Sequence, residues 1–158
     1  GLYPGTGETA AIGDGPGAGY TMNIPLPPRS SDLEYLAVLT DLIAPAVRSF
    51  GPDVLLVSAG FDAHRHDPIS RMHLRTDGYG LIADRLVELA TSTDASLGFV
   101  LEGGYALEAL AASVARVHDV LEGETVRKPQ GYVDPDVATV IDDVRRAHDG
   151  VGDVCDLD

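Results

Sequence analysis

The sequence predicts an α/β protein in which a parallel sheet lies between two layers of helices. Two continuous apolar runs, residues 54–60 and 97–101, are each followed by a segment whose apolar residues recur at helical spacing. Uninterrupted apolar runs of this length are typical of strands buried on both faces of a parallel sheet. Strand and helix therefore alternate along the chain, as expected for a three-layer α/β/α fold.

Length and composition fit a globular protein of this class. The chain has 158 residues, of which 44% are apolar and 23% are charged. A chain of this length buries roughly two thirds of the surface that it exposes when unfolded, which is enough for one ordinary domain. Cys155 is the only cysteine, and this excludes disulfide scaffolds and cysteine-rich zinc sites.

The first 50 residues are predicted to contain a glycine-rich loop, a short strand and a helix. Residues 1–19 carry closely spaced glycines, and residues 20–26 alternate enough for a strand that ends at two prolines. Ser31 and Glu34 form a capping box at the start of the helix. Apolar residues at helical spacing continue this helix, and Pro45 is expected to bend its last turn.

Three more helices are predicted after the first apolar run. Asp77 caps a helix that lies between the two runs, and a largely apolar helix over residues 107–121 follows the second run. A polar linker over residues 122–133 precedes a final helix that begins at Asp134 and Pro135.

The charge balance excludes several classes of partner. Lys and Arg number 11 and Asp and Glu number 25, so the formal net charge is −14. A surface this negative repels phosphate, and we therefore expect no direct binding to nucleic acid or to an anionic membrane. The sequence contains neither an apolar run of membrane-spanning length nor a signal peptide, so we expect a cytoplasmic protein. Such acidity also suits a halophilic cytoplasm.

The first candidate site follows the first apolar run. Asp62, His64, His66 and Asp67 place two carboxylates and two imidazoles within six residues. These side chains are ligands that zinc and related divalent ions accept, which suggests a metal site. Asp and His also favour turns, so the same residues suit a solvated loop in which Asp67 caps the turn before Pro68. From the residues alone both interpretations stay open.

The second candidate site follows the second apolar run, at Glu102-Gly103-Gly104-Tyr105. Two glycines allow a sharp turn that directs the tyrosine back over the strand ends, where its phenol could donate a hydrogen bond to an oxyanion. Loop glycines are common, however, and composition by itself favours a plain strand-to-helix turn with a packed tyrosine.

Seven segments of the sequence, taken together, form a recognisable set. They are Tyr3-Pro4-Gly5-Thr6-Gly7, Gly19-Tyr20, Asn23-Ile24-Pro25-Leu26-Pro27, Pro52-Asp53 through Asp62, Asp67-Pro68, Thr76-x-Gly78-Tyr79 and Leu101-Glu102-Gly103-Gly104-Tyr105. In order and spacing they resemble one family over about residues 1–123, the histone deacetylase-like metal amidohydrolases, which have the arginase/deacetylase fold. The remainder is expected to be a polar linker, a terminal helix and an acidic tail.

The resemblance implies a zinc-dependent deacetylase that hydrolyses the acetyl amide of a lysine or another amine. In this family the metal polarises the carbonyl and activates water, a pair of histidines handles the proton, and a tyrosine stabilises the oxyanion. By position, Asp62 matches a zinc-binding aspartate and Tyr105 matches the oxyanion tyrosine. His64 and His66 match no ligand of the family and are left outside the metal set.

The resemblance also implies a substrate channel and a second cation site. Gly103 and Gly104 match the backbone beside the acyl-lysine channel, and Tyr3 and Ile69 match residues that line it. Tyr20 matches a position whose carbonyl binds a monovalent cation, and potassium is the ion expected there.

Part of the family's machinery is expected to be missing from this chain. The Asp-x-His zinc segment and the tandem histidines of the family precede the Tyr-Pro-Gly-Thr-Gly segment, at which this sequence starts. We therefore expect the C-terminal half of the catalytic domain, a fragment that is inactive alone, because one carboxylate cannot hold zinc firmly.

Two alternatives stay open. An acetylpolyamine or other small acylated amine could replace acetyl-lysine as the substrate. A non-catalytic interaction module could instead keep the fold and use its free sheet edges. The expected partner is a separately encoded N-terminal half or a second copy of the chain.

Overall fold

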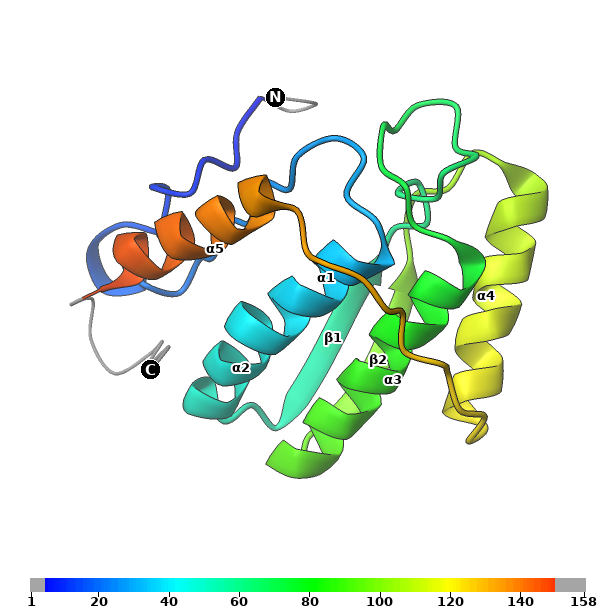
Figure 1. The fold of residues 1–158 in the computed structure, drawn as a ribbon. Coiled ribbons are helices and arrows are strands. Elements are labelled where there is room, and N and C mark those ends of the chain that lie inside the picture. The colour runs from blue at the N-terminus through cyan, green and yellow to red at the C-terminus, as the bar shows by residue number, and fades with distance from the viewer. Residues whose placement is uncertain (1–4, 150–158) are drawn as a thin grey trace.

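The computed structural model describes residues 5–149 and contains a pair of parallel strands with helices around them (Figure 1). Strand β1 (Val54–Ala59) pairs with β2 (Ser96–Leu101), in a register that sets Val54 opposite Ser96 and Ala59 opposite Leu101. Both strands coincide with the predicted apolar runs. The α/β class, with a parallel sheet flanked by helices, is therefore confirmed.

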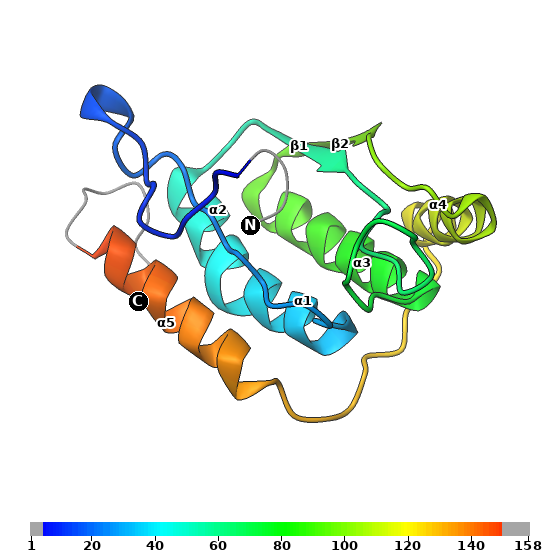
Figure 2. The same cartoon turned by 90° about the horizontal axis from the view of Figure 1, so that it is seen from above.

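The helices of the described residues gather on one side of the strands (Figure 2). They are α1 (Asp32–Val38), α2 (Ala44–Phe50), α3 (Thr76–Thr93), α4 (Leu107–Leu121) and α5 (Pro135–His148). Helix α4 packs along α3, and α5 packs on the α1 side of the molecule. No helix within residues 5–149 is both long enough and apolar enough to cross a membrane.

The prediction that the strands are buried on both faces is wrong for the described residues. Val57 and Phe99 face the helices, but Val54 is 55%, Leu56 70% and Val100 53% exposed. No described segment covers this second face. An apolar run indicates that both faces of a strand are to be buried, but it does not identify the segments that pack against each face.

The predicted strand over residues 20–26 is also wrong, because this segment pairs with no strand among the described residues. Its backbone is held in another way. The Asn23 side chain donates hydrogen bonds to the carbonyls of Ala11, at 2.8 Å, and Glu8, at 3.3 Å. Alternation of apolar residues predicts an extended conformation, and a neighbouring strand is still needed to make a sheet.

The helix is irregular just before Pro45, where the sequence predicts a bend of the last turn, and it continues beyond the proline as α2 to Phe50. A π-helical turn (Leu39–Ile43) separates α1 from α2 and ends just before this proline. Proline has no N–H to donate to the carbonyl of Asp41, four residues earlier. The Arg145 guanidinium of α5 donates to that carbonyl at 3.2 Å instead. The irregularity in one helix thus becomes an attachment point for another.

Two apolar clusters form the core. One joins α5 to α1 and the π-helical turn through Val38, Leu42, Val137, Ile141 and Val144. The other consists of Phe61, Leu74 and Tyr79 and lies beneath the loop that follows β1. This second cluster supports the candidate site from below.

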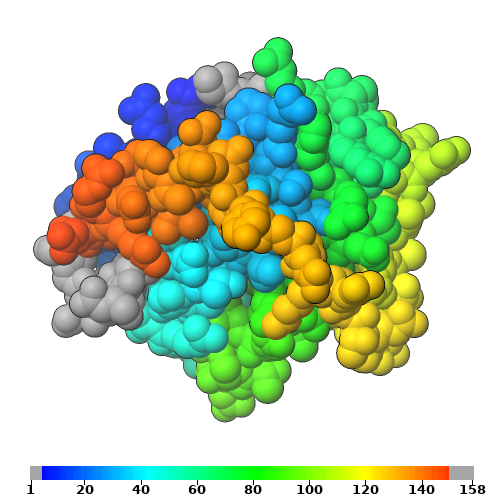
Figure 3. All heavy atoms as spheres, in the orientation of Figure 1, coloured from blue at the N-terminus to red at the C-terminus, as the bar shows by residue number. Residues whose placement is uncertain are grey.

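The linker before α5 crosses the outer surface of α3 and α1 (Figure 3). Arg116 of α4 holds its beginning by donating to the Glu124 carboxylate and the Thr125 carbonyl, each at 3.1 Å. Glu34 holds its end, because its second carboxylate oxygen accepts the N–H of Asp134 at 3.3 Å. The capping residue of α1 therefore also anchors the start of α5.

We expect Glu34→Gln to destabilise the fold by about 1–3 kcal/mol at neutral pH, since charged groups make the stronger hydrogen bonds. Glu34 is 7% exposed and accepts hydrogen bonds from the Ser31 backbone (2.8 Å) and the Ser31 hydroxyl (2.7 Å). Burial raises the pKa of Glu34, but the hydrogen bonds from Ser31 and Asp134 outweigh it, and the net pKa lies below its ordinary value.

A folded-state pKa below the unfolded value means that this stabilisation is present above about pH 4 and is lost as the pH falls through the folded pKa. Urea unfolding at several pH values should therefore show the wild type and Glu34→Gln converging in acid. Glu122→Gln, at an exposed site, is the control and should differ from the wild type by a pH-independent amount. A constant gap for Glu34→Gln would contradict the assignment.

Arg29 has a left-handed backbone, with φ of 75°, and its exposed side chain has no described hydrogen bond to justify that conformation. We expect Arg29→Gly to stabilise the fold by about 1 kcal/mol, because glycine adopts positive φ without steric cost. The matched control is Arg48→Gly, an exposed arginine within α2, which should destabilise by a similar amount. Thermal unfolding of both variants measures the difference. A loss of stability in Arg29→Gly would contradict the interpretation that the backbone is strained at Arg29.

Candidate functional site

The candidate site lies at the carboxyl ends of β1 and β2, where two loops meet (Figure 1). The N–H of Phe61 donates to the Gly103 carbonyl at 2.8 Å, and the N–H of Glu102 donates to the Ala59 carbonyl at 3.0 Å. Ligands of parallel α/β sheets bind at this edge. Both polar segments predicted from the sequence are therefore brought together by strand pairing.

The carboxylate of Asp62 lies between Gly60, which follows β1, and Gly103, which follows β2. A β-carbon at Gly60 would lie 3.1 Å from one carboxylate oxygen, and a β-carbon at Gly103 would lie 3.1 Å from the other. The two glycines thus leave the space that the half-buried carboxylate occupies. Gly103, which the resemblance assigned to the substrate channel, also shapes the seat of the predicted metal ligand.

Tyr105 lies on the loop after β2 with 55% of its surface exposed. Few side chains therefore pack against its phenol, and the position of Tyr105 is restrained mainly through its backbone. Gly104 has φ of 139°, a conformation that other residues rarely adopt. The N–H of Tyr105 donates to Oδ2 of Asp67 at 2.8 Å. The turn between strand and helix is thus built as the glycine pair predicted.

Asp67 makes a contact with the second loop that the sequence did not reveal. It is 8% exposed, and its Oδ1 accepts the N–H groups of Ile69, at 2.9 Å, and Ser70, at 3.3 Å. Asp67 thus caps a turn as expected, but the turn includes Pro68 instead of preceding it. The bond to Tyr105 spans 38 residues, and no local pattern could have indicated it. Burial raises the pKa of Asp67, but the backbone N–H bonds outweigh it and leave the net pKa below its ordinary value.

His64 is part of the loop's framework. It is 5% exposed, its Nδ1 accepts the N–H of His66 at 3.2 Å, and its ring stacks on Tyr79. Burial, followed by the positive charges of His66 and Arg65, lowers the pKa of His64. Within residues 5–149 no three His, Cys, Asp or Glu side chains come together to hold a metal ion.

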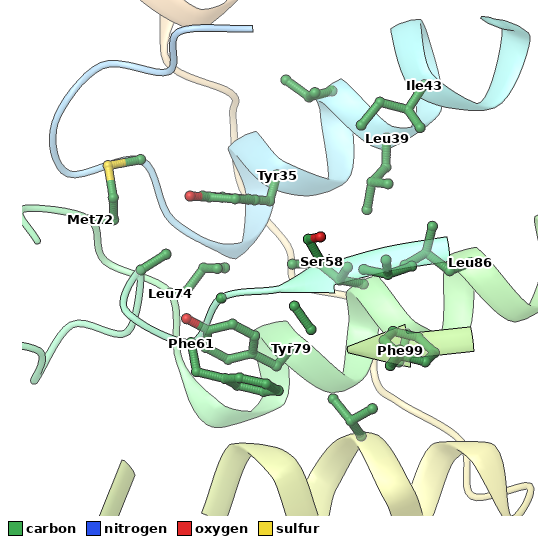
Figure 4. A pocket seen from close by; sticks show the side chains of 18 of the residues that line it. Tyr35, Leu39, Ile43, Ser58, Phe61, Met72, Leu74, Tyr79, Leu86 and Phe99 are labelled. Atoms are coloured by element: carbon green, nitrogen blue, oxygen red, sulfur yellow. The ribbon is translucent and has the colours of Figure 1, made fainter. Parts of the chain in front are cut away.

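An apolar cavity of about 610 Å³ adjoins the site, between β1, α1 and α3 (Figure 4). Tyr35, Phe61, Tyr79 and Phe99 line it, and Asp62 lies at its rim. Burial, followed by the negative charge of Asp62, raises the pKa of Tyr35 to about 12, and burial likewise raises that of Tyr79. Both phenols therefore stay protonated at neutral pH, so they can act as hydrogen-bond donors.

The remaining predicted residues are distributed differently. Ile69 is 60% exposed and belongs to the site loop, because its N–H donates to the Asp67 carboxylate. The rings of Tyr20 and Phe50 meet edge-on, with 6.2 Å between their centroids. Tyr20 also lies beside Val54, at the opposite end of β1. Its role in binding a monovalent cation stays a prediction, separate from the Asp62 site. Tyr3 lies outside the described residues.

The chain is similar in sequence to known proteins. Residues 1–121 match the model of the histone deacetylase domain. "Histone deacetylase 14, chloroplastic" of Arabidopsis thaliana is 43% identical over 125 residues, which cover 78% of this chain and 30% of that protein. A "Probable deacetylase" of Archaeoglobus fulgidus is 39% identical over 163 residues, which cover 93% of this chain and 45% of that protein.

Two solved structures are similar along nearly the whole chain. The crystal structure of the HDA15 HD domain aligns with a TM-score of 0.80, and the structure of the histone deacetylase Clr3 aligns with a TM-score of 0.85. Each is 31% identical and covers 93% of this chain, which spans 39% of the first and 25% of the second.

The fold and these similarities define an α/β protein with the fold of histone deacetylase domains. The chain belongs to the histone deacetylase domain family. It spans less than half the length of the curated relatives described above.

Proposed function

We propose that this chain forms part of a zinc-dependent deacetylase that hydrolyses the acetyl amide of a lysine or another amine. The observation that carries the proposal is the position of Asp62 and Tyr105 at the adjoining carboxyl ends of β1 and β2, joined by the bond from Phe61 to Gly103. The names of the relatives, deacetylases and histone deacetylases, support the same reaction class.

Asp62 fits the role of one zinc ligand, because its carboxylate is half-buried in a space that glycines keep open. Catalytic zinc takes three protein ligands. The described residues bring no three candidates together, so at least one further ligand would come from outside residues 5–149. When bound, zinc would supply the polarisation of the amide carbonyl.

Tyr105 would stabilise the charge that develops during amide hydrolysis. Its exposed phenol lies on the turn after β2, where it could donate a hydrogen bond to the oxygen that becomes negative as water attacks the carbonyl. Gly103 and Gly104 would let the substrate approach the backbone closely, with Ile69 and Tyr3 along the channel. The histidines that move the proton in this family are not assigned to residues of this chain.

The incomplete ligand set predicts that the purified chain of 158 residues holds no stoichiometric zinc and releases no acetate from acetyl-lysine peptides. Metal analysis after dialysis and an acetate-release assay measure both quantities. Robust turnover that a chelator abolishes would contradict this prediction and would require His64 or His66 in the metal site.

The deacetylase proposal itself is tested by a chimera in which the N-terminal part of the Archaeoglobus relative precedes this chain. We expect the chimera to bind one zinc ion, and to hydrolyse an acetylated amine in a chelator-sensitive way. Asp62→Asn in the chimera should lose the zinc. A chimera that folds, binds zinc and hydrolyses no acetylated amine would overturn the proposal.

The same assay can distinguish between candidate substrates. The net charge of −14 favours cationic molecules by long-range attraction, so acetylated polyamines are the alternative to acetyl-lysine. Comparing kcat/KM for the two substrates at low and high salt separates them, because only a steered polycation should lose rate steeply with salt. The cytoplasm is the proposed location, although the Arabidopsis relative is chloroplastic by name.

The exposed sheet face favours a second, non-catalytic possibility. Val54, Leu56 and Val100 lie on this face of adjacent strands and are each more than half exposed, and such apolar patches often mark interfaces. An interaction module would cover this face with an N-terminal half or a second copy of the chain. Light scattering distinguishes the cases, because a monodisperse oligomer supports the module and progressive aggregation opposes it.

A further inference from the structure

The carboxylate of Asp67 performs two separate tasks with its two oxygens. Oδ1 accepts the N–H groups of Ile69 and Ser70 within its own loop, at 2.9 Å and 3.3 Å. Oδ2 reaches the other loop and accepts the N–H of Tyr105 at 2.8 Å. One side chain thus joins the loop after β1 to the turn after β2.

Tyr105 depends on its backbone for its orientation. Its side chain is 55% exposed, so few neighbours restrict the phenol. The turn before it is set by the Gly103 carbonyl, which accepts from Phe61, and by the positive φ of Gly104. Among the side chains of the described residues, the one with a hydrogen bond to Tyr105 itself is Asp67.

Asp67 is placed on a rigid support. Its own N–H donates to the His64 carbonyl at 2.8 Å. The loop is closed on its other side by Arg65 and Leu74, whose backbones are joined at 2.8 Å. Because Asp67 is 8% exposed and its net pKa is lowered by the N–H groups around it, the carboxylate is ionised at neutral pH. Hydrogen bonds to an ionised acceptor are stronger than neutral ones.

We propose that Asp67 is a positioning residue, which fixes the direction of the Tyr105 phenol through the bond between its Oδ2 and the Tyr105 N–H. Its importance for catalysis rests on the proposed function, in which Tyr105 stabilises the oxyanion. The positioning itself concerns two loops of this chain and can be measured without metal or turnover.

Asp67→Asn separates the two tasks of the carboxylate. The asparagine oxygen can still accept from Ile69 and Ser70, where two N–H groups need an acceptor. Its amide nitrogen then faces Tyr105 and has no lone pair to accept that N–H. The variant should keep the turn of its own loop and lose only the connections to the turn after β2, which are made to the backbone N–H groups of Tyr105 and Ala106.

Amide hydrogen exchange, followed in ¹H–¹⁵N spectra, and aromatic ¹H–¹³C spectra of the whole chain test this separation. In Asp67→Asn we expect exchange at Tyr105 to rise about tenfold or more, and exchange at Ile69 and Ser70 to rise less than about threefold. The Tyr105 ring signals should shift as the phenol gains freedom. Glu108→Gln removes an exposed charge three residues after Tyr105 and is the control, with all three amides unchanged.

Unchanged exchange and ring signals at Tyr105 in Asp67→Asn would overturn the proposal. Equal loss of protection at Tyr105, Ile69 and Ser70 would also overturn it, because that result means general loosening of the loop. Asp67→Ala removes both acceptor oxygens and should raise the exchange rates of all three amides. Its rates give the upper limit against which those of Asp67→Asn are compared. In an active chimera Asp67→Asn should lower kcat and leave KM nearly unchanged, and an inactive chimera would contradict the proposed function while the exchange result still stands.

Discussion

Replacing Gly104 with alanine is expected to lower the free energy of unfolding by about 2–4 kcal/mol. The backbone φ of 139° strains any side chain at this position. An added β-carbon would also lie 3.0 Å from Cβ of Phe61 and 3.0 Å from Cδ1 of Leu110. Both neighbours belong to packed segments, so the turn must move, and Tyr105 moves with it. Urea unfolding monitored by circular dichroism measures the loss.

Gly103→Ala is the matched control for this prediction. Gly103 has no positive φ, and its added β-carbon would contact only the Asp62 carboxylate, at 3.1 Å. A side-chain oxygen can yield by a few tenths of an ångström, so we expect a loss below about 1 kcal/mol. Equal losses in the two variants would contradict the role assigned to the Gly104 conformation.

Tyr105→Phe is expected to lower the turnover of the active chimera about 10²- to 10³-fold, the usual effect of removing one oxyanion donor. The side chain is 55% exposed, so loss of its hydroxyl should leave the fold and zinc content unchanged. KM should change little, because the hydrogen bond is made to the charge that develops during reaction. Steady-state kinetics with an acetylated lysine peptide measures both constants.

The control for Tyr105→Phe is Tyr132→Phe, which removes the hydroxyl of a tyrosine that is 98% exposed in the linker. This variant should keep full activity. If Tyr105→Phe in the chimera retained more than about a tenth of the wild-type turnover, the phenol would not be the principal oxyanion donor.

Much of the fold could be predicted because its signals are local. The two apolar runs became β1 and β2, the Ser31 and Glu34 capping box started α1, and Asp134 and Pro135 started α5. The pair Gly103 and Gly104 indicated a sharp turn, and Gly104 has the required positive φ. Caps, glycines and periodicity act over one or two turns of chain, and one sequence is enough to read them.

The predictions that failed needed partners that a local pattern does not contain. Residues 20–26 alternate like a strand, yet no neighbour pairs with them among the described residues. Residues 54–60 have the composition of a strand covered on both faces, yet Leu56 is 70% exposed in the described chain. A pattern of apolar residues states a requirement for burial, and tertiary contacts decide whether and by what it is met.

The sequence by itself determined the helices, the two paired strands, the two candidate segments and the family to which they belong. Only the tertiary structure decided that Asp67 holds Tyr105, that Gly103 seats the Asp62 carboxylate, and that Tyr20 lies at the far end of β1. The reason is geometric. Parallel pairing of β1 with β2 brings together residues about 40 positions apart, and hydrogen bonds of about 3 Å form only after that pairing has set the two loops side by side.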